Sequence, residues 1–452
     1  MAVSVVPTLP IVASGALPAP IASAAVSTAP ALNLRRSLRL APTTPAVRTA
    51  RGPARLRIAI VTPEAGPGAG VPHYWRALAG VLSRQHEVHL FAGHHEGVPL
   101  PGVHVHRLPA LKAGWFLTHA AFYAAANTRF ALARVLRRRP FDLVLGIGAL
   151  TPFADVATVH FVQAREQDLE RRKLFPKERT RTGLASLDYA LYSHAMSWIG
   201  RRFYKQTDAL IVTISKSVKD DLASLEGAPL GAMVVVPNGV DVERFHPDNR
   251  ERHRASTRAE LGLGREHTAV LFVGNSWGRK GLRTAIEAIR GPEHANVRLV
   301  VVGDGVAAPF LDGLPADVVD RIIFAGAQSH EVERFYAAAD VFILPTLYEP
   351  FGLVILEAMA CGLPTIVSAC AGAAEWLKDG VDLVLLQDPT DGEGARAALH
   401  SIVSDPAFAA GLAANGRRAA ESLQWSHVAE QIVEAAGVRV RARQQLQEAR
   451  AI

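Results

Sequence analysis

Two glutamates with seven residues between them, Glu349 and Glu357, are the first candidates for binding chemistry in this chain. Glu349 lies in the stretch 345–352, whose two prolines and one glycine predict an irregular turn before a helix. The amino terminus of a helix presents free N–H groups and the positive end of the helix dipole, and both favour phosphate. Ionised carboxylates only accept hydrogen bonds and repel phosphate, so these glutamates suit hydroxyl groups. The pattern fits a ligand with a diphosphate and hydroxyls, as a nucleotide sugar has; the alternative is two ordinary surface acids.

A second anion site is predicted at residues 274–281, GNSWGRKG. This loop joins an apolar, strand-like run to a run of good helix formers, LRTAIEAI. Arg279 and Lys280 can therefore meet the amides of a helix amino terminus at one anionic group. The alternative is that they are two solvated cations ahead of a helix.

The elements that must position these residues alternate between strand and helix. Residues 341–344 predict a buried strand, 353–360 a helix that Gly362 and Pro364 end, and 365–367 a further strand. Near the other end of the chain, 56–63 predicts a buried strand, followed by a glycine-rich loop and a helix that begins near Val71. We therefore expect an α/β fold.

The composition agrees with a globular protein of several domains. At 452 residues, with 49% hydrophobic and 20% charged residues, the chain can form two or three domains with substantial cores. Cys361 and Cys370 are too few for a disulfide framework and form no metal-ligand pattern, which favours a reducing cytoplasm. No apolar run reaches the roughly 18 residues that a membrane-spanning helix needs.

The net charge of +7 comes from one end of the chain. Residues 1–57 contain seven arginines and no lysine, aspartate or glutamate, so the remainder balances 42 basic against 42 acidic side chains. This balance argues against nucleic acid as a partner of the folded part. We expect residues 1–55, rich in Ala, Pro, Ser and Thr, to be a disordered extension. A transit peptide and a mistaken start codon both remain open for this segment.

The glycine-rich loop from Gly66 to Gly70 lets the backbone approach a ligand closely. A dinucleotide site would need an acidic residue about 20 residues further on, at the end of the next strand. His94 and His95 stand there instead, so NAD binding is disfavoured. With His73, they lie in no cluster of zinc or magnesium spacing, and we expect no metal and no cofactor.

Several motifs, in one order, resemble glycosyltransferase family 4, whose members are retaining enzymes with the GT-B fold. EPFGLVILEAMACGLP, which begins at Glu349, resembles the E-x7-E motif of that family, and the similarity covers about residues 56–435. The other stretches that resemble the family are TDALIVTISKSVKDDL from Thr207, VVVPNGVDVERFHP from Val234, LFVGNSWGRKGLRTAIEAI from Leu271, LVVVGDG from Leu299 and ERFYAAADVFILPT from Glu333.

The resemblance implies two Rossmann-like domains that face each other across a cleft. The expected bounds are 56–240 for the amino-terminal, acceptor-side domain and 241–424 for the nucleotide-sugar-binding domain. Residues 425–452 are expected to form a helix that crosses back to the first domain. The implied reaction moves a hexose from a nucleotide diphosphate sugar to a hydroxyl of a glycan or glycolipid acceptor, by front-face attack without an enzyme nucleophile.

The resemblance also implies roles for individual residues. Lys280 and Arg279 would neutralise the leaving diphosphate. Glu349 would hold hydroxyls of the transferred sugar, and Glu357 those of the ribose. His160, after the apolar run DVATV, would reach the donor sugar from the first domain. The remaining donor-binding residues would be Gly70, Gly274, Asn275, Phe351, Gly352 and Leu353.

One position departs from the family pattern. Family members usually carry an arginine directly after the first glycine of the 274–281 loop, where this chain has Asn275. Arg279 would then supply the charge from the other side of the loop. The loop resembles that of the lipopolysaccharide core glucosyltransferases, which points to synthesis of cell-envelope polysaccharide. The departure leaves open a regulatory protein that binds nucleotide sugars without turnover; a phosphorylase or an epimerase of the same fold is a further alternative.

Two segments mix basic and aromatic residues and are candidates for contact with the acceptor. They are residues 115–139 and residues 165–205, the second with ten basic and five acidic side chains. Such segments can lie on an anionic membrane surface. We therefore expect a cytoplasmic protein with peripheral contact to the inner membrane; the alternative is core-facing helices with a solvated basic face.

Overall fold

The computed structural model describes residues 55–66, 70–95, 100–109, 114–135, 140–172, 183–328 and 331–451. Apart from Arg55, the expected disordered extension lies outside the described residues. So do Gly68 of the glycine-rich loop, the basic run 137–139 and residues 173–182 of the second basic segment.

The first half of the described chain forms a parallel sheet of seven strands, in the order β3-β2-β1-β4-β5-β6-β7. Its strands are β1 (Arg57–Ala65), β2 (Glu87–His95), β3 (Val103–Arg107), β4 (Leu143–Ile147), β5 (Val156–Val159), β6 (Leu210–Thr213) and β7 (Met233–Val235). The helices between them are α1 (Val71–Leu82), α2 (Trp115–Val135), α3 (Gln163–Arg171), α4 (Leu184–Gln206) and α5 (Lys216–Asp221). Buried apolar side chains line both faces of the central strands because helices cover both faces of the sheet.

The second half forms a parallel sheet of six strands, in the order β10-β9-β8-β11-β12-β13. Its strands are β8 (Thr268–Val273), β9 (Val297–Val302), β10 (Ile322–Gly326), β11 (Val341–Leu344), β12 (Thr365–Ser368) and β13 (Val384–Leu386). Its helices are α6 (Asn249–Glu260), α7 (Leu282–Ala288), α8 (Ala308–Leu311), α9 (Ala316–Val319), α10 (Glu333–Ala338), α11 (Leu353–Ala360), α12 (Gly392–Ser404) and α13 (Pro406–Ser422). The predicted strand 341–344 and helix 353–360 coincide with β11 and α11.

The strand order reverses once in each sheet, between β1 and β4 and between β8 and β11. At such a point the loops after the two strands leave in opposite directions, and ligands bind between them at the carboxyl ends. In the second sheet these loops are residues 274–281 and 345–352. The topology therefore brings together the two stretches that the sequence marks as anion sites.

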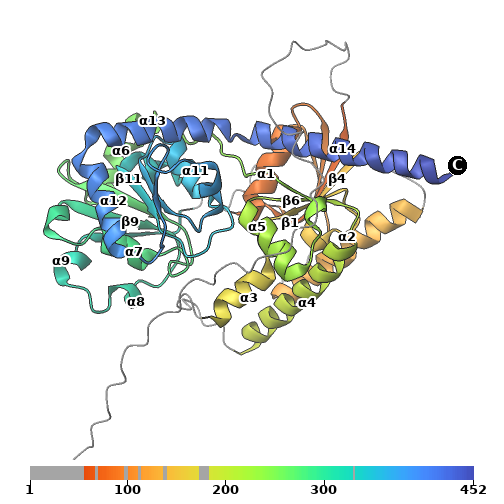
Figure 1. Cartoon of the computed structure of the whole chain (residues 1–452), viewed down its shortest axis with the longest axis horizontal. Coiled ribbons are helices and arrows are strands. Elements are labelled where there is room, and N and C mark those ends of the chain that lie inside the picture. Colours follow the sequence, from red (N-terminus) through yellow and green to blue (C-terminus); the bar gives the residue numbers. More distant parts are fainter. Residues whose placement is uncertain are drawn as a thin grey trace, which may run out of the picture. The chain divides into compact units, whose positions relative to one another are not determined.

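The last helix, α14 (Trp425–Ala451), packs on α1 of the first sheet, as Figure 1 shows. Its residues Trp425, Val428 and Ile432 are buried in one cluster with Trp75 of α1. The Trp425 ring lies edge-on to Tyr74, with ring centroids 5.4 Å apart. The chain thus returns from the second sheet to cover the first.

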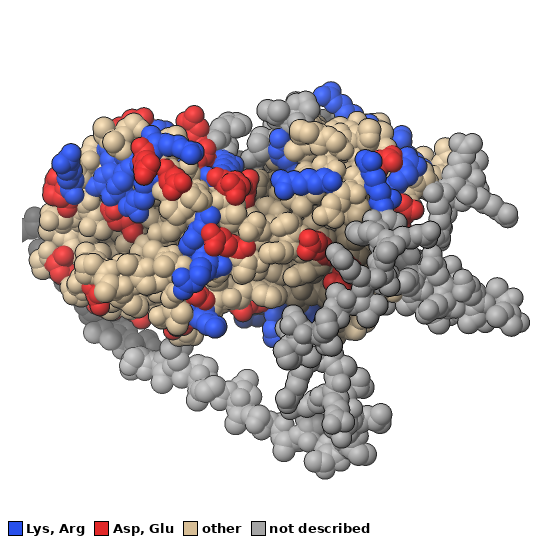
Figure 2. All heavy atoms as spheres, turned by 90° about the horizontal axis from the view of Figure 1, so that it is seen from above, with Lys and Arg blue, Asp and Glu red and all other residues tan. Residues whose placement is uncertain are grey.

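The surface of the described residues carries both signs of charge. On the face drawn in Figure 2, acidic and basic side chains lie in scattered groups among many uncharged residues. Within the described residues, no helix has both the length and the apolar character needed to span a membrane.

Candidate active site

The loop after β8 depends on glycine at two positions. Gly274 has a φ of 147°, and a Cβ there would lie 2.4 Å from the Cδ atom of Lys280. Gly281 has a φ of 80°, and a Cβ there would lie 1.9 Å from the carbonyl oxygen of Pro345. Glycine therefore allows the Lys280 side chain to lie across the loop, and it allows the loop to touch the start of the turn after β11.

Lys280 and Arg279 converge on Glu349. The Nζ atom of Lys280 lies 2.5 Å from Oε2 of Glu349, and both side chains are nearly buried, at 11% and 13% exposure. Nη1 of Arg279 lies 3.5 Å from the same oxygen and donates a 2.6 Å hydrogen bond to the Tyr348 carbonyl. Among the described residues none donates to Oε1 of Glu349, so this oxygen is available to a ligand hydroxyl.

The two glutamates have opposite pKa shifts. Burial alone raises the pKa of Glu349, but the charges of Lys280 and Arg279 and their hydrogen bonds outweigh burial and hold this pKa below its usual value. The pKa of Glu357 is raised, mainly by burial, although a 2.8 Å hydrogen bond from Tyr336 Oη opposes the shift. Glu349 is therefore an ionised acceptor, whereas Glu357 takes up a proton more readily.

Tyr336 was not predicted as a site residue. It is fully buried at the end of α10 and fixes the carboxylate of Glu357 from a neighbouring element. The sequence offered one signal, because Tyr336 lies in the motif ERFYAAAD that directly precedes β11.

The amino end of α11 carries the other predicted contacts. Gly352 has a φ of 96° and no side chain caps the helix, so its first N–H groups remain available to an anion. Phe351 is buried, and its carbonyl accepts a 2.8 Å hydrogen bond from the Ala373 amide. Leu353 packs against the core of the second sheet and also against the cluster around α1 and α14. The end of this helix therefore lies where the two halves of the structure touch.

Asn275 is exposed and serves the loop itself. Its Oδ1 accepts a 2.8 Å hydrogen bond from the Asp304 amide, which ties the loop after β8 to the one after β9. A neutral amide can make this tie, but it adds no positive charge. The cations within this loop are thus Arg279 and Lys280, and both already contact Glu349.

His160 lies directly after β5, and its ring is buried against Tyr74, with centroids 4.3 Å apart. Its Nε2 lies 3.1 Å from Oγ1 of Thr158, and burial lowers its pKa to about 3, so the imidazole is neutral near pH 7. The Tyr74 amide donates a 3.1 Å hydrogen bond to Gly70, where α1 begins without a side-chain cap. His160 and Gly70 thus belong to one corner of the first sheet. Among the contacts recorded for the described residues, none joins His160 to Glu349.

One cluster of metal-ligating side chains lies elsewhere, on the first sheet. Among the described residues, Glu87, His89 and His104 place ligand atoms within 4.8 Å of one another. The sequence does not predict this group directly, because its members lie on two different strands, β2 and β3. The available signal was the alternation of His and Glu at every second residue, which puts side chains on one face of a strand.

Two known protein families match the two halves of this chain. The family described as Glycosyltransferase Family 4 matches residues 68–244, and the family described as Glycosyl transferases group 1 matches residues 267–405. The chain is 31% identical over 313 residues to the GDP-mannose-dependent alpha-(1-6)-phosphatidylinositol monomannoside mannosyltransferase of Mycolicibacterium smegmatis, a match that covers 64% of this chain and 78% of that protein. The chain therefore belongs to glycosyltransferase family 4, whose enzymes transfer a sugar from a nucleotide sugar.

Two other relatives differ in how much of them is matched. An uncharacterized glycosyltransferase of Methanocaldococcus jannaschii is 27% identical over 396 residues, which cover 84% of this chain and 97% of that protein. The D-inositol 3-phosphate glycosyltransferase of Rhodococcus jostii is 33% identical over 243 residues, and the match spans about half, 52%, of its length.

Solved structures confirm the predicted GT-B fold with its two Rossmann-like sheets. WaaG, a glycosyltransferase involved in lipopolysaccharide biosynthesis, superposes with a TM-score of 0.64 at 21% identity, covering 84% of this chain and 99% of WaaG. HepE of Anabaena, in complex with UDP-glucose, superposes with a TM-score of 0.63 at 16% identity, covering 85% of this chain and all of HepE. At these identities the similarity concerns the fold.

The buried ion pair makes a first prediction. Lys280→Met leaves Glu349 as a buried carboxylate with only the longer contact to Arg279, and we expect a loss of roughly 3–5 kcal/mol in the free energy of unfolding. The double variant Lys280→Met/Glu349→Gln removes both charges and should regain part of that loss, as urea unfolding would measure. Lys216→Met breaks an exposed pair with Asp220 and serves as the control, with a loss below about 1 kcal/mol. Strictly additive losses in the double variant would contradict a coupled pair.

The buried imidazole makes a second prediction. Between pH 3 and 6.5 the unfolded chain protonates His160 while the folded chain does not, so folding stability falls on acidification by about 1.4 kcal/mol per pH unit. We expect His160→Gln to lack this component, so that wild type loses about 2 kcal/mol more than the variant between pH 7.5 and pH 5. Equal losses in urea unfolding would show that His160 protonates freely in the folded state; His194→Gln, at an exposed position, is the control.

Proposed function

We propose that this chain transfers a hexose, with retention of configuration, from a nucleotide diphosphate sugar to a hydroxyl of a glycan or glycolipid. The observation that carries this proposal is the buried contact of Lys280 and Arg279 with Glu349 beside the uncapped end of α11. The two cations and the helix amides could bind a diphosphate. The adjacent carboxylate oxygen could accept hydrogen bonds from sugar hydroxyls. The Mycolicibacterium relative is named for a GDP-mannose donor and a lipid acceptor, and HepE is seen with UDP-glucose.

The ion pair sets the course of the reaction in this proposal. An incoming diphosphate competes with Glu349 for Lys280 and Arg279, so donor binding redistributes charge that is already in place. As the glycosidic bond breaks, negative charge grows on the leaving diphosphate, and the two cations stabilise it. The acceptor hydroxyl attacks from the same face and gives its proton to the leaving group. Glu349, held ionised by two cations, is a hydroxyl acceptor and a poor nucleophile.

The remaining residues orient the donor. Glu357 would bind the ribose hydroxyls, with Tyr336 holding its carboxylate in place. His160 would contact the donor sugar from the first sheet as a neutral imidazole, which donates or accepts a hydrogen bond but does not serve as an acid near pH 7. Asn275, Gly274 and the amides after Phe351 would complete the donor site.

An apolar stripe on α4 supports a membrane-linked acceptor. Four large side chains are 50–85% exposed and share one helix face, because they lie at intervals of three, four and seven residues: Leu184, Leu187, Leu191 and Trp198. The exposed Arg201, Arg202 and Lys205 follow on the same helix. On α2, which packs beside α4, Trp115 and Leu117 are half exposed. These side chains are not core-facing, and they fit an anionic membrane surface, which we propose to be the cytoplasmic one.

The donor experiment is a panel of UDP-, GDP- and ADP-sugars, scored by thermal shift and by slow donor hydrolysis. We expect one nucleotide sugar to bind, to raise the melting temperature and to be hydrolysed slowly. A chain that binds no donor would contradict the transferase proposal. A chain that binds a donor but never turns it over with any acceptor would instead be a nucleotide-sugar-binding regulator.

Glu357→Ala tests the ribose contact in the same assay. Each lost charge-assisted hydrogen bond costs about 1.5–3 kcal/mol, so donor affinity should fall by roughly tenfold or more while the chain stays folded. Glu375→Ala, which removes a carboxylate bound to the amides of Lys216 and Ser217, is a matched control outside the proposed ribose contact. Unchanged donor binding in Glu357→Ala would overturn the ribose assignment.

The membrane surface is tested by co-sedimentation with vesicles. Wild type should sediment with anionic vesicles and less with neutral ones, and Leu187→Glu/Trp198→Glu should sediment several-fold less. Val438→Glu, an exposed apolar position on α14, should behave as wild type. Equal sedimentation of all three with anionic vesicles, or none for wild type, would contradict the assignment of this stripe.

A further inference from the structure

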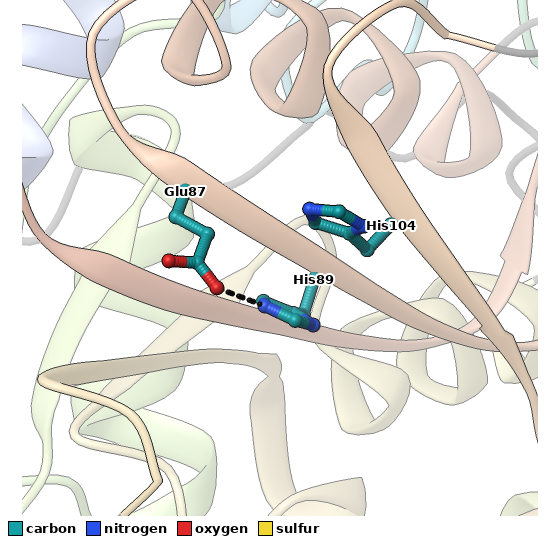
Figure 3. Close-up of side chains that lie close together, drawn as sticks. All are labelled: Glu87, His89 and His104. Carbon is teal, nitrogen blue, oxygen red and sulfur yellow. Dashed lines mark hydrogen bonds and ion pairs between the residues drawn. The ribbon is translucent and has the colours of Figure 1, made fainter.

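Three histidines and a glutamate gather on one face of the outer strands of the first sheet. Glu87 and His89 are alternate residues of β2, and His104 and His106 are alternate residues of the edge strand β3. The parallel register pairs His89 with His104 and Phe91 with His106. Because side chains repeat every second residue in a strand, all four groups lie on the face that also carries α2. Figure 3 shows Glu87, His89 and His104 projecting to the same side.

We propose that Glu87, His89 and His104 bind one divalent first-row transition-metal ion, such as Zn²⁺. Their ligand atoms all lie within 4.8 Å of one another. Ligand atoms around a tetrahedral zinc ion are about 3.3 Å apart, since each lies about 2.0–2.2 Å from the metal. Side-chain rotation must therefore close the group by roughly 1.5 Å at most. Two imidazoles and a carboxylate suit zinc and its neighbours, and a fourth position would hold water.

The hydrogen bonds of His89 already have the pattern that a metal-bound histidine needs. Its Nε2 lies 2.9 Å from Oε1 of Glu87, and its Nδ1 lies 2.8 Å from Nε2 of His106. An ion between Glu87 and His89 would take the place of the proton on Nε2, and Nδ1–H would then donate to His106. Metal-bound histidines nearly always donate their other N–H to such an acceptor, which fixes ring orientation. His106 is therefore a positioning residue.

Exposure decides which group moves. The His89 side chain is 13% exposed and Glu87 33% exposed, whereas His104 is exposed and stacks on His89 with ring centroids 4.8 Å apart. His104 can turn toward the ion without disturbing the core, and the open side gives the ion a path from solvent. Once bound, the ion would cross-link the edge strand β3 to β2.

The positive charge of Arg57 opposes binding of a metal cation. Its Nε donates a 3.0 Å hydrogen bond to Oε1 of Glu87, while its Nη1 donates to the Pro140 carbonyl. Arg129 also lies on this face, over the ring of Phe91. Oε1 of Glu87 faces Nε2 of His89 and also accepts from Arg57, so an ion bound between Glu87 and His89 competes with the arginine for this oxygen. The positive charge of the arginine lowers the affinity of the site for a cation.

Calorimetric titration of the full, untagged chain with ZnCl₂ and CoCl₂, after removal of metal with a chelator, tests this site. We expect one equivalent to bind, a visible d–d band for cobalt and a higher melting temperature with zinc. His104→Ala should weaken metal binding by at least about tenfold. His106→Phe should weaken it by about 10–100-fold, the usual effect of removing the hydrogen-bond acceptor of a metal-bound histidine.

His194→Ala is the matched control, because this histidine is exposed and bonds only to the Ala190 carbonyl of its own helix among the described contacts. Circular dichroism of each variant before titration separates loss of the site from loss of the fold. No saturable binding by wild type would overturn the proposal. The proposal would also be overturned if His104→Ala bound zinc as tightly as wild type and as His194→Ala.

Discussion

The contact between Lys280 and Glu349 is the interaction on which the proposed site depends. A carboxylate buried in the second sheet would take up a proton unless a cation lay beside it, and Lys280, with Arg279, supplies that charge. The same contact neutralises part of the positive charge that a diphosphate would meet. In the proposed reaction, donor binding must rearrange this interaction. Its two partners lie 69 residues apart in the chain, on different loops, so a shift of either loop changes the distance between the two charges.

The fold determines where this contact forms. In the second sheet the strand order reverses between β8 and β11, so their loops meet at one edge although two strands lie between them in the chain. Gly274 and Gly281 allow the two loops to approach without a collision. The first sheet repeats the arrangement, and His160 and Gly70 lie at its corresponding corner. One topology thus positions the residues proposed to contact the donor in the second half and those proposed to contact the sugar in the first.

The two glutamates show how neighbouring residues give chemically identical groups different pKa shifts. Glu349 is surrounded by cations and keeps its charge, whereas Glu357 has a tyrosine hydroxyl and a dry environment. At the outer edge of the first sheet, tertiary structure also decides which side chains meet. The strand register pairs His89 with His104, although they are not close in sequence. The expected place of this enzyme in lipopolysaccharide synthesis stays a prediction, because the similarity to WaaG extends to the fold.

Sequence alone determined the elements on either side of Glu349: strand 341–344 and helix 353–360 follow from apolar runs bounded by Gly and Pro, which act locally. It also marked Glu349, Glu357, Arg279 and Lys280 as candidate binding groups, because residue type sets what a side chain can donate or accept. Only the tertiary structure decided the pairing of Lys280 with Glu349, the bond from Tyr336 to Glu357 and the grouping of Glu87 with His104. These contacts join residues far apart in the chain, and their pKa shifts depend on burial and on neighbouring charge. Neither quantity exists until the chain has folded.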